Sequence, residues 1–233
     1  MKYYMFKSDI FNGHIVIKDN NNLILIDTGS PITIHISESL ELCSETYICQ
    51  THSLGLTPSK LSEMVGMELT TLLGVDIISK YKLLLDYKQN MVSFHKDPVA
   101  AISDCDKNQI EIETLMGIPI IKLIIDDKPL KFFLDTGAKL SYLSNNHTQN
   151  YKSIYKEEDF YPSIGKFETD CFKIQVIFEN EKFDVIFGNL PPLLQMPLMI
   201  GGIDGIIGYD FFMAFKILLD LENEKMGYGR NDE

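Results

Sequence analysis

The stretch Ile24-Leu25-Ile26-Asp27-Thr28-Gly29-Ser30 returns in altered form as Phe132-Phe133-Leu134-Asp135-Thr136-Gly137-Ala138. Both are apolar runs that end in Asp-Thr-Gly and a small residue. An apolar run that stops at turn residues is typical of a buried strand. The sequence therefore predicts two buried strands, each of which delivers one aspartate into a tight turn.

A second pair of repeats follows in the same order. Six of thirteen positions are identical between Gly74–Asp86 and Gly208–Asp220, which indicates a diverged duplication. The interval between the two motifs is 26 residues longer in the second half than in the first. Polar and small residues replace apolar ones at 97–108, so we divide the chain into an N-terminal half, 1–100, and a C-terminal half, 101–233.

The segments around these repeats are mostly strand-like. Turn residues bound the runs that we expect to be strands: 14–18, 23–27, 82–86, 91–95, 119–125 and 130–135. Short helical turns are expected at 76–80 and 210–214, and a short helix at 58–66. The predicted fold class is all-β, mainly β with short helices.

Two facing carboxyl groups that share one proton can activate water and polarise a carbonyl together. The ionised acid takes a proton from water, while the protonated acid donates to the carbonyl oxygen. Like charges so close cannot both ionise, so the pair titrates as a unit. Asp27 and Asp135 are the candidate catalytic pair.

The neighbours of each aspartate suit this task. The glycines permit a tight turn, and the threonine hydroxyls are expected to brace the two turns against each other. A serine hydroxyl is expected to donate to the Asp27 carboxylate, whereas the alanine after the second motif cannot do so for Asp135. The predicted turn support comprises Thr28, Gly29, Ser30, Thr136, Gly137 and Ala138.

Other repeated polar residues have structural interpretations. Asp76 and Asp210 are predicted to be helix N-caps, and Asp86 and Asp220 to be turn residues at strand ends. The repeated lysines Lys82 and Lys216 are predicted to be solvated strand positions.

These motifs resemble those of the retropepsin and pepsin superfamily of aspartic proteases. The family pattern is an apolar pair, Asp-Thr-Gly-Ser/Thr/Ala, and later an apolar pair followed by Gly, which here is Leu72-Leu73-Gly74 and Ile206-Ile207-Gly208. The resemblance implies a two-lobed acid-protease fold with the active site between the lobes. It also implies that one chain with two motifs completes a site, so that a monomer is sufficient.

The resemblance further implies a hairpin flap over the cleft. The additional residues of the second half include 159–169, a segment that is predicted to form a hairpin with a glycine at its tip. In the first half, the corresponding interval contains 57–66, which is predicted to be helical. We therefore expect the flap to come from the second half only, with Tyr161, Ser163, Ile164 and Gly165 as substrate-binding candidates. The alternative is a surface loop away from the cleft.

Composition limits the partners. A formal net charge of −12 repels nucleic acid and anionic lipid, so we expect neither as a partner. No apolar stretch is long enough to span a bilayer, and the N-terminus lacks a signal-like apolar region, so a cytoplasmic location is expected.

The four cysteines and five histidines show no metal-ligand spacing, so no metal or cofactor is expected. We expect the cysteines to be reduced, because a reducing compartment disfavours disulfides; a Cys43–Cys49 disulfide is the alternative.

The favoured function is that of an aspartic endopeptidase acting on a peptide or protein. The alternative is a catalytically silent module of the same fold that binds peptides or proteins, because fold does not fix function. A glycosidase also uses two carboxylates, but the Asp-Thr-Gly context gives that reading little support.

Overall fold

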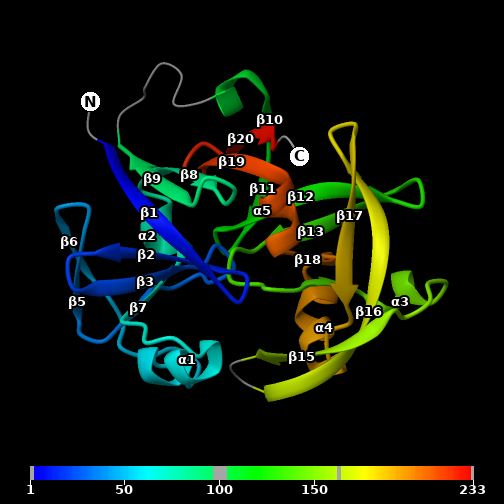
Figure 1. Cartoon of the computed structure of the whole chain (residues 1–233), viewed down its shortest axis with the longest axis horizontal. Coiled ribbons are helices and arrows are strands. Elements are labelled where there is room, and N and C mark those ends of the chain that lie inside the picture. The colour runs from blue at the N-terminus through cyan, green and yellow to red at the C-terminus, as the bar shows by residue number, and fades with distance from the viewer. Residues whose placement is uncertain (1–2, 97–103, 162–163, 232–233) are drawn as a thin grey trace.

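The computed structural model describes residues 3–96, 104–161 and 164–231, which are mostly strands with a few short helices (Figure 1). This confirms the mainly β fold class. The boundary expected near residue 100 lies in 97–103, outside the described residues, so the division into 1–100 and 101–233 stays a prediction. The N-terminal half contains β1 (Tyr3–Phe11), β2 (His14–Asp19), β3 (Asn22–Ile26), β4 (Ile34–His35), β5 (Ser39–Leu42), β6 (Glu45–Ile48), α1 (Pro58–Val65), β7 (Thr71–Leu73), α2 (Val75–Ile78), β8 (Lys82–Asp86) and β9 (Met91–His95).

The C-terminal half repeats this order with longer strands after its Asp-Thr-Gly turn. It contains η1 (Asp104–Lys107), β10 (Gln109–Glu111), β11 (Glu113–Leu115), β12 (Ile118–Ile125), β13 (Lys128–Leu134), β14 (Ser141–Leu143), α3 (Asn145–Thr148), β15 (Tyr155–Tyr161), β16 (Gly165–Phe178), β17 (Glu181–Gly188), α4 (Pro192–Ile200), β18 (Gly205–Ile207), α5 (Tyr209–Ala214), β19 (Phe215–Asp220) and β20 (Lys225–Arg230). The additional residues of this half therefore build the β15–β16–β17 meander and α4.

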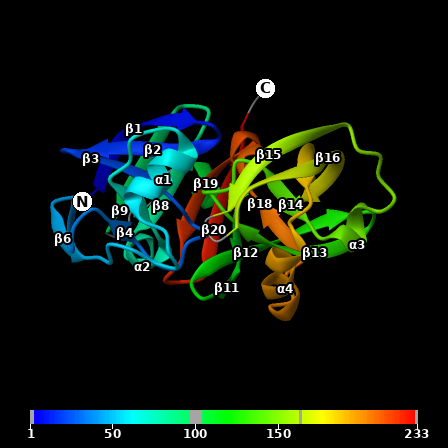
Figure 2. The ribbon, with the colours of Figure 1, turned by 90° about the horizontal axis from the view of Figure 1, so that it is seen from below.

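One sheet joins the two halves. Its strand order is β10-β20-β19-β8-β9-β1-β2-β3-β7-β4, so the repeated strands β8 and β19 pair with each other at the junction. Strands β9 and β20 flank this pair on opposite sides, as a local two-fold relation between the halves requires. Figure 2 shows the two halves side by side, with β19 and β20 between them.

Each aspartate follows a strand that is held on both sides. Strand β3 pairs antiparallel with β2 and parallel with β7, and β13 has the same relation to β12 and β18. The backbone N–H of Asp27 donates to the Leu73 carbonyl at 2.9 Å, and that of Asp135 donates to the Ile207 carbonyl at 3.0 Å. The two Asp-Thr-Gly turns therefore start from buried strand ends that are hydrogen-bonded on both sides.

The glycine after each apolar pair is required by close packing. A Cβ at Gly74 would lie 2.6 Å from the carbonyl carbon of Ile32, and a Cβ at Gly208 would lie 2.2 Å from the carbonyl oxygen of Ala138. Both distances are far inside van der Waals contact. The apolar-apolar-Gly motif thus lets the strand end pass directly beneath the Asp-Thr-Gly turn of its own half.

The main apolar core is continuous across the halves. It contains Ile24 and Ile26 from β3 together with Phe211 and Phe215 from the second half. A separate cluster lies between α1 and the outer face of β2 and β3, where Leu61 and Val65 of the helix pack. The second half has a smaller cluster of its own, which contains Leu140, Tyr142 and Leu190. The halves consequently share one main core, and each has a separate smaller cluster.

Two reciprocal ion pairs cross the β8–β19 junction. Lys216 Nζ lies 2.7 Å from Asp86 Oδ2, and Lys82 Nζ lies 2.9 Å from Asp220 Oδ2. The prediction that the two lysines are simply solvated is therefore wrong. The two acids do bind turn backbone, because Asp86 accepts from Gln89 N–H and Asp220 from Asn223 N–H.

The repeated acids of the short helices are not N-caps. Gly74 and Gly208 occupy the N-cap positions of α2 and α5, so Asp76 and Asp210 lie inside the first turn. Asp76 Oδ1 accepts from the N–H and hydroxyl of Thr33, and Asp210 Oδ2 accepts from Ile186 N–H. Each acid thus ties its helix to a neighbouring segment of the same half.

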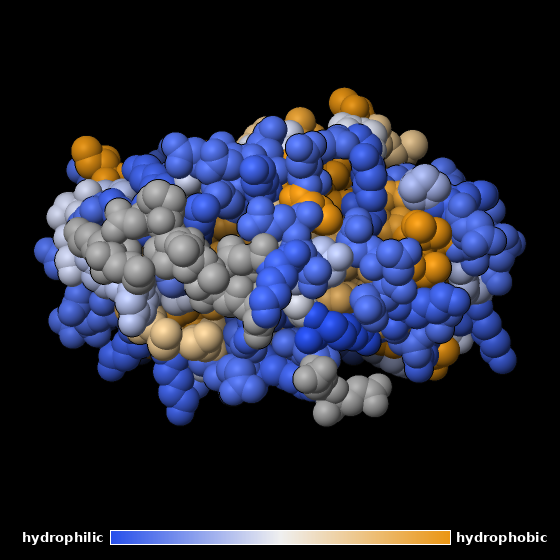
Figure 3. All heavy atoms as spheres, turned by 90° about the horizontal axis from the view of Figure 1, so that it is seen from above, coloured by the Kyte–Doolittle hydropathy of each residue, from blue (hydrophilic) through white to orange (hydrophobic). Residues whose placement is uncertain are grey.

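The visible surface in Figure 3 is mostly hydrophilic with scattered apolar side chains, in line with the net charge of −12. Within the described part of the chain, no helix has the length and apolar character needed to cross a bilayer. All four cysteines are buried and free, so the Cys43–Cys49 disulfide is not formed.

Replacing Lys216 with Met is expected to lower the free energy of unfolding by about 2–3 kcal/mol, because it leaves the fully buried Asp86 carboxylate without its cation. The matched change Lys82→Met is expected to cost about 1 kcal/mol or less, since Asp220 retains contact with water and with Asn223. Urea denaturation followed by circular dichroism measures both. Equal losses in the two variants would contradict the role assigned to burial.

Candidate active site

The two Asp-Thr-Gly turns are joined by reciprocal hydrogen bonds. Thr28 N–H donates to Thr136 Oγ1, and Thr136 N–H donates to Thr28 Oγ1, both at 3.0 Å. Each hydroxyl also donates to the carbonyl of the residue before the opposite aspartate. The Thr28 hydroxyl donates to the Leu134 carbonyl, and the Thr136 hydroxyl donates to the Ile26 carbonyl, both at 2.7 Å. Both threonines are buried, so these four bonds fix the turns against each other without competition from water.

This bracing brings each glycine against the opposite carboxyl group. A Cβ at Gly29 would lie 2.3 Å from Asp135 Cγ, and a Cβ at Gly137 would lie 2.7 Å from Asp27 Cγ. Any larger side chain at either position would push the carboxyl groups apart. Each aspartate also accepts the N–H of the glycine in its own turn, at 2.9 Å for Asp27 and 2.7 Å for Asp135.

The electrostatics of the pair are unequal. Burial, the charge of Asp135 and a hydrogen bond to Asp135 raise the pKa of Asp27 well above its ordinary value. Burial also raises the pKa of Asp135, but the Gly137 N–H and the hydrogen bond from Asp27 act in the opposite direction. The two acids therefore titrate as one unit, and after the first ionisation they share a single proton.

The Ser30 side chain, directly after the first motif, has a different role from the one expected. The Ser30 hydroxyl donates to the Ile32 carbonyl at 2.8 Å, so it does not bond the Asp27 carboxylate as predicted. The backbone N–H groups of Ser30 and Ala138 close their turns on the carbonyls of Asp27 and Asp135, both at 3.3 Å. The two turns are therefore nearly equivalent, despite the different side chains that follow them.

The segment expected to form the flap is a hairpin of β15 and β16. Tyr161 pairs with Gly165, and Ile164 N–H donates to the Tyr161 carbonyl at 3.0 Å. Gly165 has φ of 86°, a left-handed conformation that glycine adopts without strain. Burial and then the charges of Asp135 and Asp27 raise the pKa of Tyr161, so its ring lies within electrostatic reach of both acids. Ser163 lies outside the described residues.

The hairpin of the first half points elsewhere. Cys43 N–H, at the β5–β6 turn, donates to Asp19 Oδ2 at 3.0 Å. Asp19 lies beside the start of β3, and the five residues of that strand separate it by about 17 Å from Asp27. The turn between β5 and β6 therefore lies at the far end of the half from the two acids.

Sequence reasoning missed three side chains near the second turn: His14, Lys139 and Phe160. Lys139 Nζ lies 3.2 Å from Glu157 Oε1 and 2.7 Å from the Glu158 carbonyl, both on β15. The Phe160 ring contacts the His14 ring with 6.2 Å between centroids. The only sequence signal was that Lys139 follows the motif closely, because the other two depend on how the halves meet.

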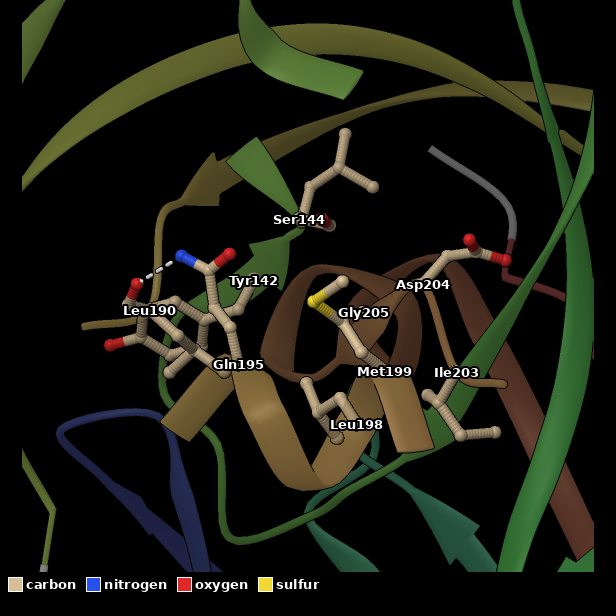
Figure 4. Close-up of a pocket in the computed structure, with 10 residues that line it drawn as sticks. Tyr142, Ser144, Leu190, Gln195, Leu198, Met199, Ile203, Asp204 and Gly205 are labelled. Carbon is tan, nitrogen blue, oxygen red and sulfur yellow. Dashed lines mark hydrogen bonds between the residues drawn. The ribbon is translucent and has the colours of Figure 1, made fainter. Parts of the chain in front are cut away.

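A small hollow beneath α4 is unrelated to the acids. It has a volume of about 10 Å³, room for about one water molecule, and its lining residues include Tyr142, Gln195 and Asp204 (Figure 4). Both turns lie outside its lining. Among the described residues, no group of three or more His, Cys, Asp or Glu side chains is placed to hold a metal ion.

No protein-family model matches the chain, and no curated protein matches its sequence. Solved structures similar to it include a foamy viral protease-reverse transcriptase in complex with an RNA/DNA hybrid, at 12% identity and a TM-score of 0.32, over 40% of this chain and 11% of that chain. EIAV protease complexed with the inhibitor HBY-793 has 22% identity and a TM-score of 0.30, over 40% of this chain and 84% of that chain. A retropepsin-like aspartic protease from Rickettsia conorii has 16% identity and a TM-score of 0.38, over 52% of this chain and 89% of that chain.

Asp27→Asn is expected to stabilise the protein at pH 7. Because the pKa of Asp27 is raised in the native state, the free energy of unfolding of the unaltered protein falls as pH rises from about 3.9 through that raised pKa. Asparagine has no proton to lose, so this decline is reduced in the variant. Chemical denaturation between pH 4 and 7 measures the effect, with the exposed Asp184→Asn as control. The same pH dependence in Asp27→Asn and the unaltered protein would show that the pKa is not raised.

Proposed function

We propose that this protein is an aspartic endopeptidase of the retropepsin-like and pepsin-like kind, which hydrolyses peptide bonds with a water activated between Asp27 and Asp135. A peptide or protein is the proposed substrate. One chain supplies both acids, so a monomer is sufficient for a complete site. A cytoplasmic location belongs to this proposal and rests on the sequence alone.

The observation that carries the proposal is the mutual approach of the two turns. Gly29 faces the Asp135 carboxyl group and Gly137 faces that of Asp27, each so closely that no Cβ would fit. A structural β-turn has no need to bring a second carboxyl group to this position, where like charges repel. Burying two acids together costs stability, and an arrangement that does so at a strand end is typical of a catalytic pair.

One shared proton gives each acid a role, and we assign that proton to Asp27, because more of the interactions of Asp135 act to lower its pKa. Asp135, the ionised partner, takes a proton from water as the water oxygen bonds to the carbonyl carbon of the substrate. Asp27 donates its proton to the carbonyl oxygen, which gives a neutral tetrahedral diol. When the diol collapses, Asp135 passes its proton to the leaving nitrogen and Asp27 recovers a proton from a diol hydroxyl. The pair thus returns to its starting state.

The β15–β16 hairpin is the proposed flap, and it comes from the second half alone. Tyr161 and Ile164 are the side chains proposed to contact substrate, with Gly165 shaping the tip. The interaction of Tyr161 with both acids supports this assignment. A flap that closes over the pair would exclude water other than the attacking molecule and would hold the substrate backbone.

Asp27→Asn and Asp135→Asn are each expected to reduce cleavage of a mixed peptide library to the uncatalysed level, because each acid has a separate role in one unit and the losses do not add. Mass spectrometry of the library after incubation detects the products. Asp184→Asn, which removes an exposed acid paired with Lys173, is the matched control and should cleave normally.

Two outcomes would count against this assignment. Substantial turnover by either active-site variant would exclude the catalytic pair. If the unaltered protein retains peptides from the library without cutting them, the protein is instead a silent binding module of the same fold.

The pH–rate profile is expected to peak at mildly acidic pH. Burial raises the pKa of both acids, so the singly protonated state that the reaction needs extends toward neutrality and is lost at strongly acid pH. The measurement is kcat/KM for a cleaved peptide between pH 2 and 8. A rate that still rises below the ordinary aspartate value of about 3.9 would contradict the raised pKa values.

A further inference from the structure

His14 lies where the first half touches the second active-site turn. It begins β2, directly after the turn at Asn12 and Gly13, and its side chain is only 4% exposed. A Cβ at Gly13 would lie 2.9 Å from Lys139 Cβ, so the tip of the β1–β2 hairpin is pressed against the other half. The ring is therefore enclosed at the junction of the halves.

The ring has an apolar contact but lacks ordinary polar ones. Neither ring nitrogen has a hydrogen-bond partner of normal geometry among the described residues, although the backbone of Gly137 approaches the ring. Its aromatic neighbour is Phe160 of β15. A neutral imidazole suits such a place, because burying a charged ring without partners costs much more free energy.

Phe160 is the flap residue that reaches into the first half. It packs against the cluster formed by α1 with β2 and β3, which contains Val16, Leu25 and Leu61. Its backbone N–H donates to Asp159 Oδ1 at 2.8 Å, and the other Asp159 oxygen accepts from Tyr142 of β14. The end of the hairpin is thus seated on the first half while its base is fixed to the second.

Lys139 completes the connection on the second turn. Besides its contacts with Glu157 and the Glu158 carbonyl, its Nζ lies 3.9 Å from Asp159 Oδ1. Lys139 is two residues beyond Gly137, which faces the Asp27 carboxyl group. One side chain therefore links the base of the flap to the catalytic turn, directly beside His14.

We propose that His14 is a positioning residue whose neutral ring forms the seat on which Phe160 holds the flap closed over Asp27 and Asp135. The proposal rests on the proposed function, since a flap has a role only if a substrate is held beneath it. The seat belongs to one side of the cleft, because only the second half supplies a flap. Ile118, which begins the equivalent strand β12 in the second half, has no imidazole.

The charges around His14 make the seat sensitive to acid. Lys139 faces it from the second turn, and the partners of Lys139 on β15 are Glu157 and Asp159. Its own hairpin has no charged residue from Ile10 to Val16. Burial and then the Lys139 charge lower the pKa of His14 from 6.5 to about 4. The stability of the neutral seat is therefore full above about 6.5 and is lost as pH falls toward about 4. Protonation places a second cation beside Lys139 and loosens its hold on β15.

Hydrogen exchange of the flap tests the seat without any need for activity. His14→Ala is expected to speed exchange in the peptide covering β15 by about tenfold, because it removes the ring beneath Phe160, while β19 and β20 keep their protection. His14→Phe, which restores a ring, should return the protection. His95→Ala, at a buried histidine on β9, is the matched control and should leave β15 unchanged. Normal β15 protection in His14→Ala would overturn the proposal, as would a loss spread over the whole molecule.

The pH dependence separates a positioning role from a structural one. As pH falls from 7 to 5, β15 of the unaltered protein should lose protection from hydrogen exchange, after the exchange rates are corrected for the intrinsic effect of pH. Over the same range, KM for a cleaved peptide should rise by a larger factor than kcat falls. His14→Phe cannot titrate, so both changes should be reduced in it. Parallel pH dependence in the two proteins would refute the proposal. If no peptide is cut at all, the proposed function fails, and the exchange data still decide whether His14 seats the hairpin.

Discussion

The reciprocal hydrogen bonds between Thr28 and Thr136 are the constraint on which the rest of the site depends. Two buried carboxyl groups repel each other when both are ionised, so the turns need a connection that does not depend on the shared proton. The threonines hold the backbone of each turn to the other through two N–H donors and two hydroxyls, at a place that water does not reach. Loss of one hydroxyl removes the partner of a buried N–H group and of a carbonyl on the opposite half, which costs about 1–3 kcal/mol for each unsatisfied group. The acids therefore stay close because their neighbours are bonded.

Duplication explains why one junction contains so many reciprocal contacts. When two related halves meet about a local two-fold axis, a contact from residue i to residue j is repeated from the equivalent of i to the equivalent of j. The threonine pair, the glycine–carboxyl approach and the two Lys–Asp bridges all follow this rule. Symmetry does not make the copies equal in energy: Asp86 is fully buried and Asp220 is not, so one bridge depends more strongly on its cation than the other.

The sequence predicted what depends on short range and repetition. Apolar runs bounded by turns located β2, β3, β8, β9, β12 and β13 to within a residue or two, and the repeated Asp-Thr-Gly identified the two turns. The sequence did not reveal contacts between the two halves. Lys82 and Lys216 were predicted to be solvated, because the acids that they pair with are far away in sequence. Ser30 read as a donor to Asp27, since spacing does not reveal that the Ile32 carbonyl lies nearer to its hydroxyl. The position of Phe160 on His14 was equally invisible, because neither residue belongs to a repeat.

The departure from symmetry bears most directly on mechanism. The second half spends its additional residues on the β15–β17 meander, while the first half has α1 in the corresponding interval, packed on the outer face of β2 and β3. A hairpin from one half needs a contact on the other if it is to span the space between them, and α1 with His14 provides it. The surroundings of the two acids also differ, because the backbone groups of Gly137, Gly29 and Ala138 lower the pKa of Asp135, whereas those of Gly29 and Ser30 lower that of Asp27. A nearly symmetric pair of turns thus lies within an asymmetric frame, in which the β15–β16 hairpin of the second half contacts the first half through Phe160.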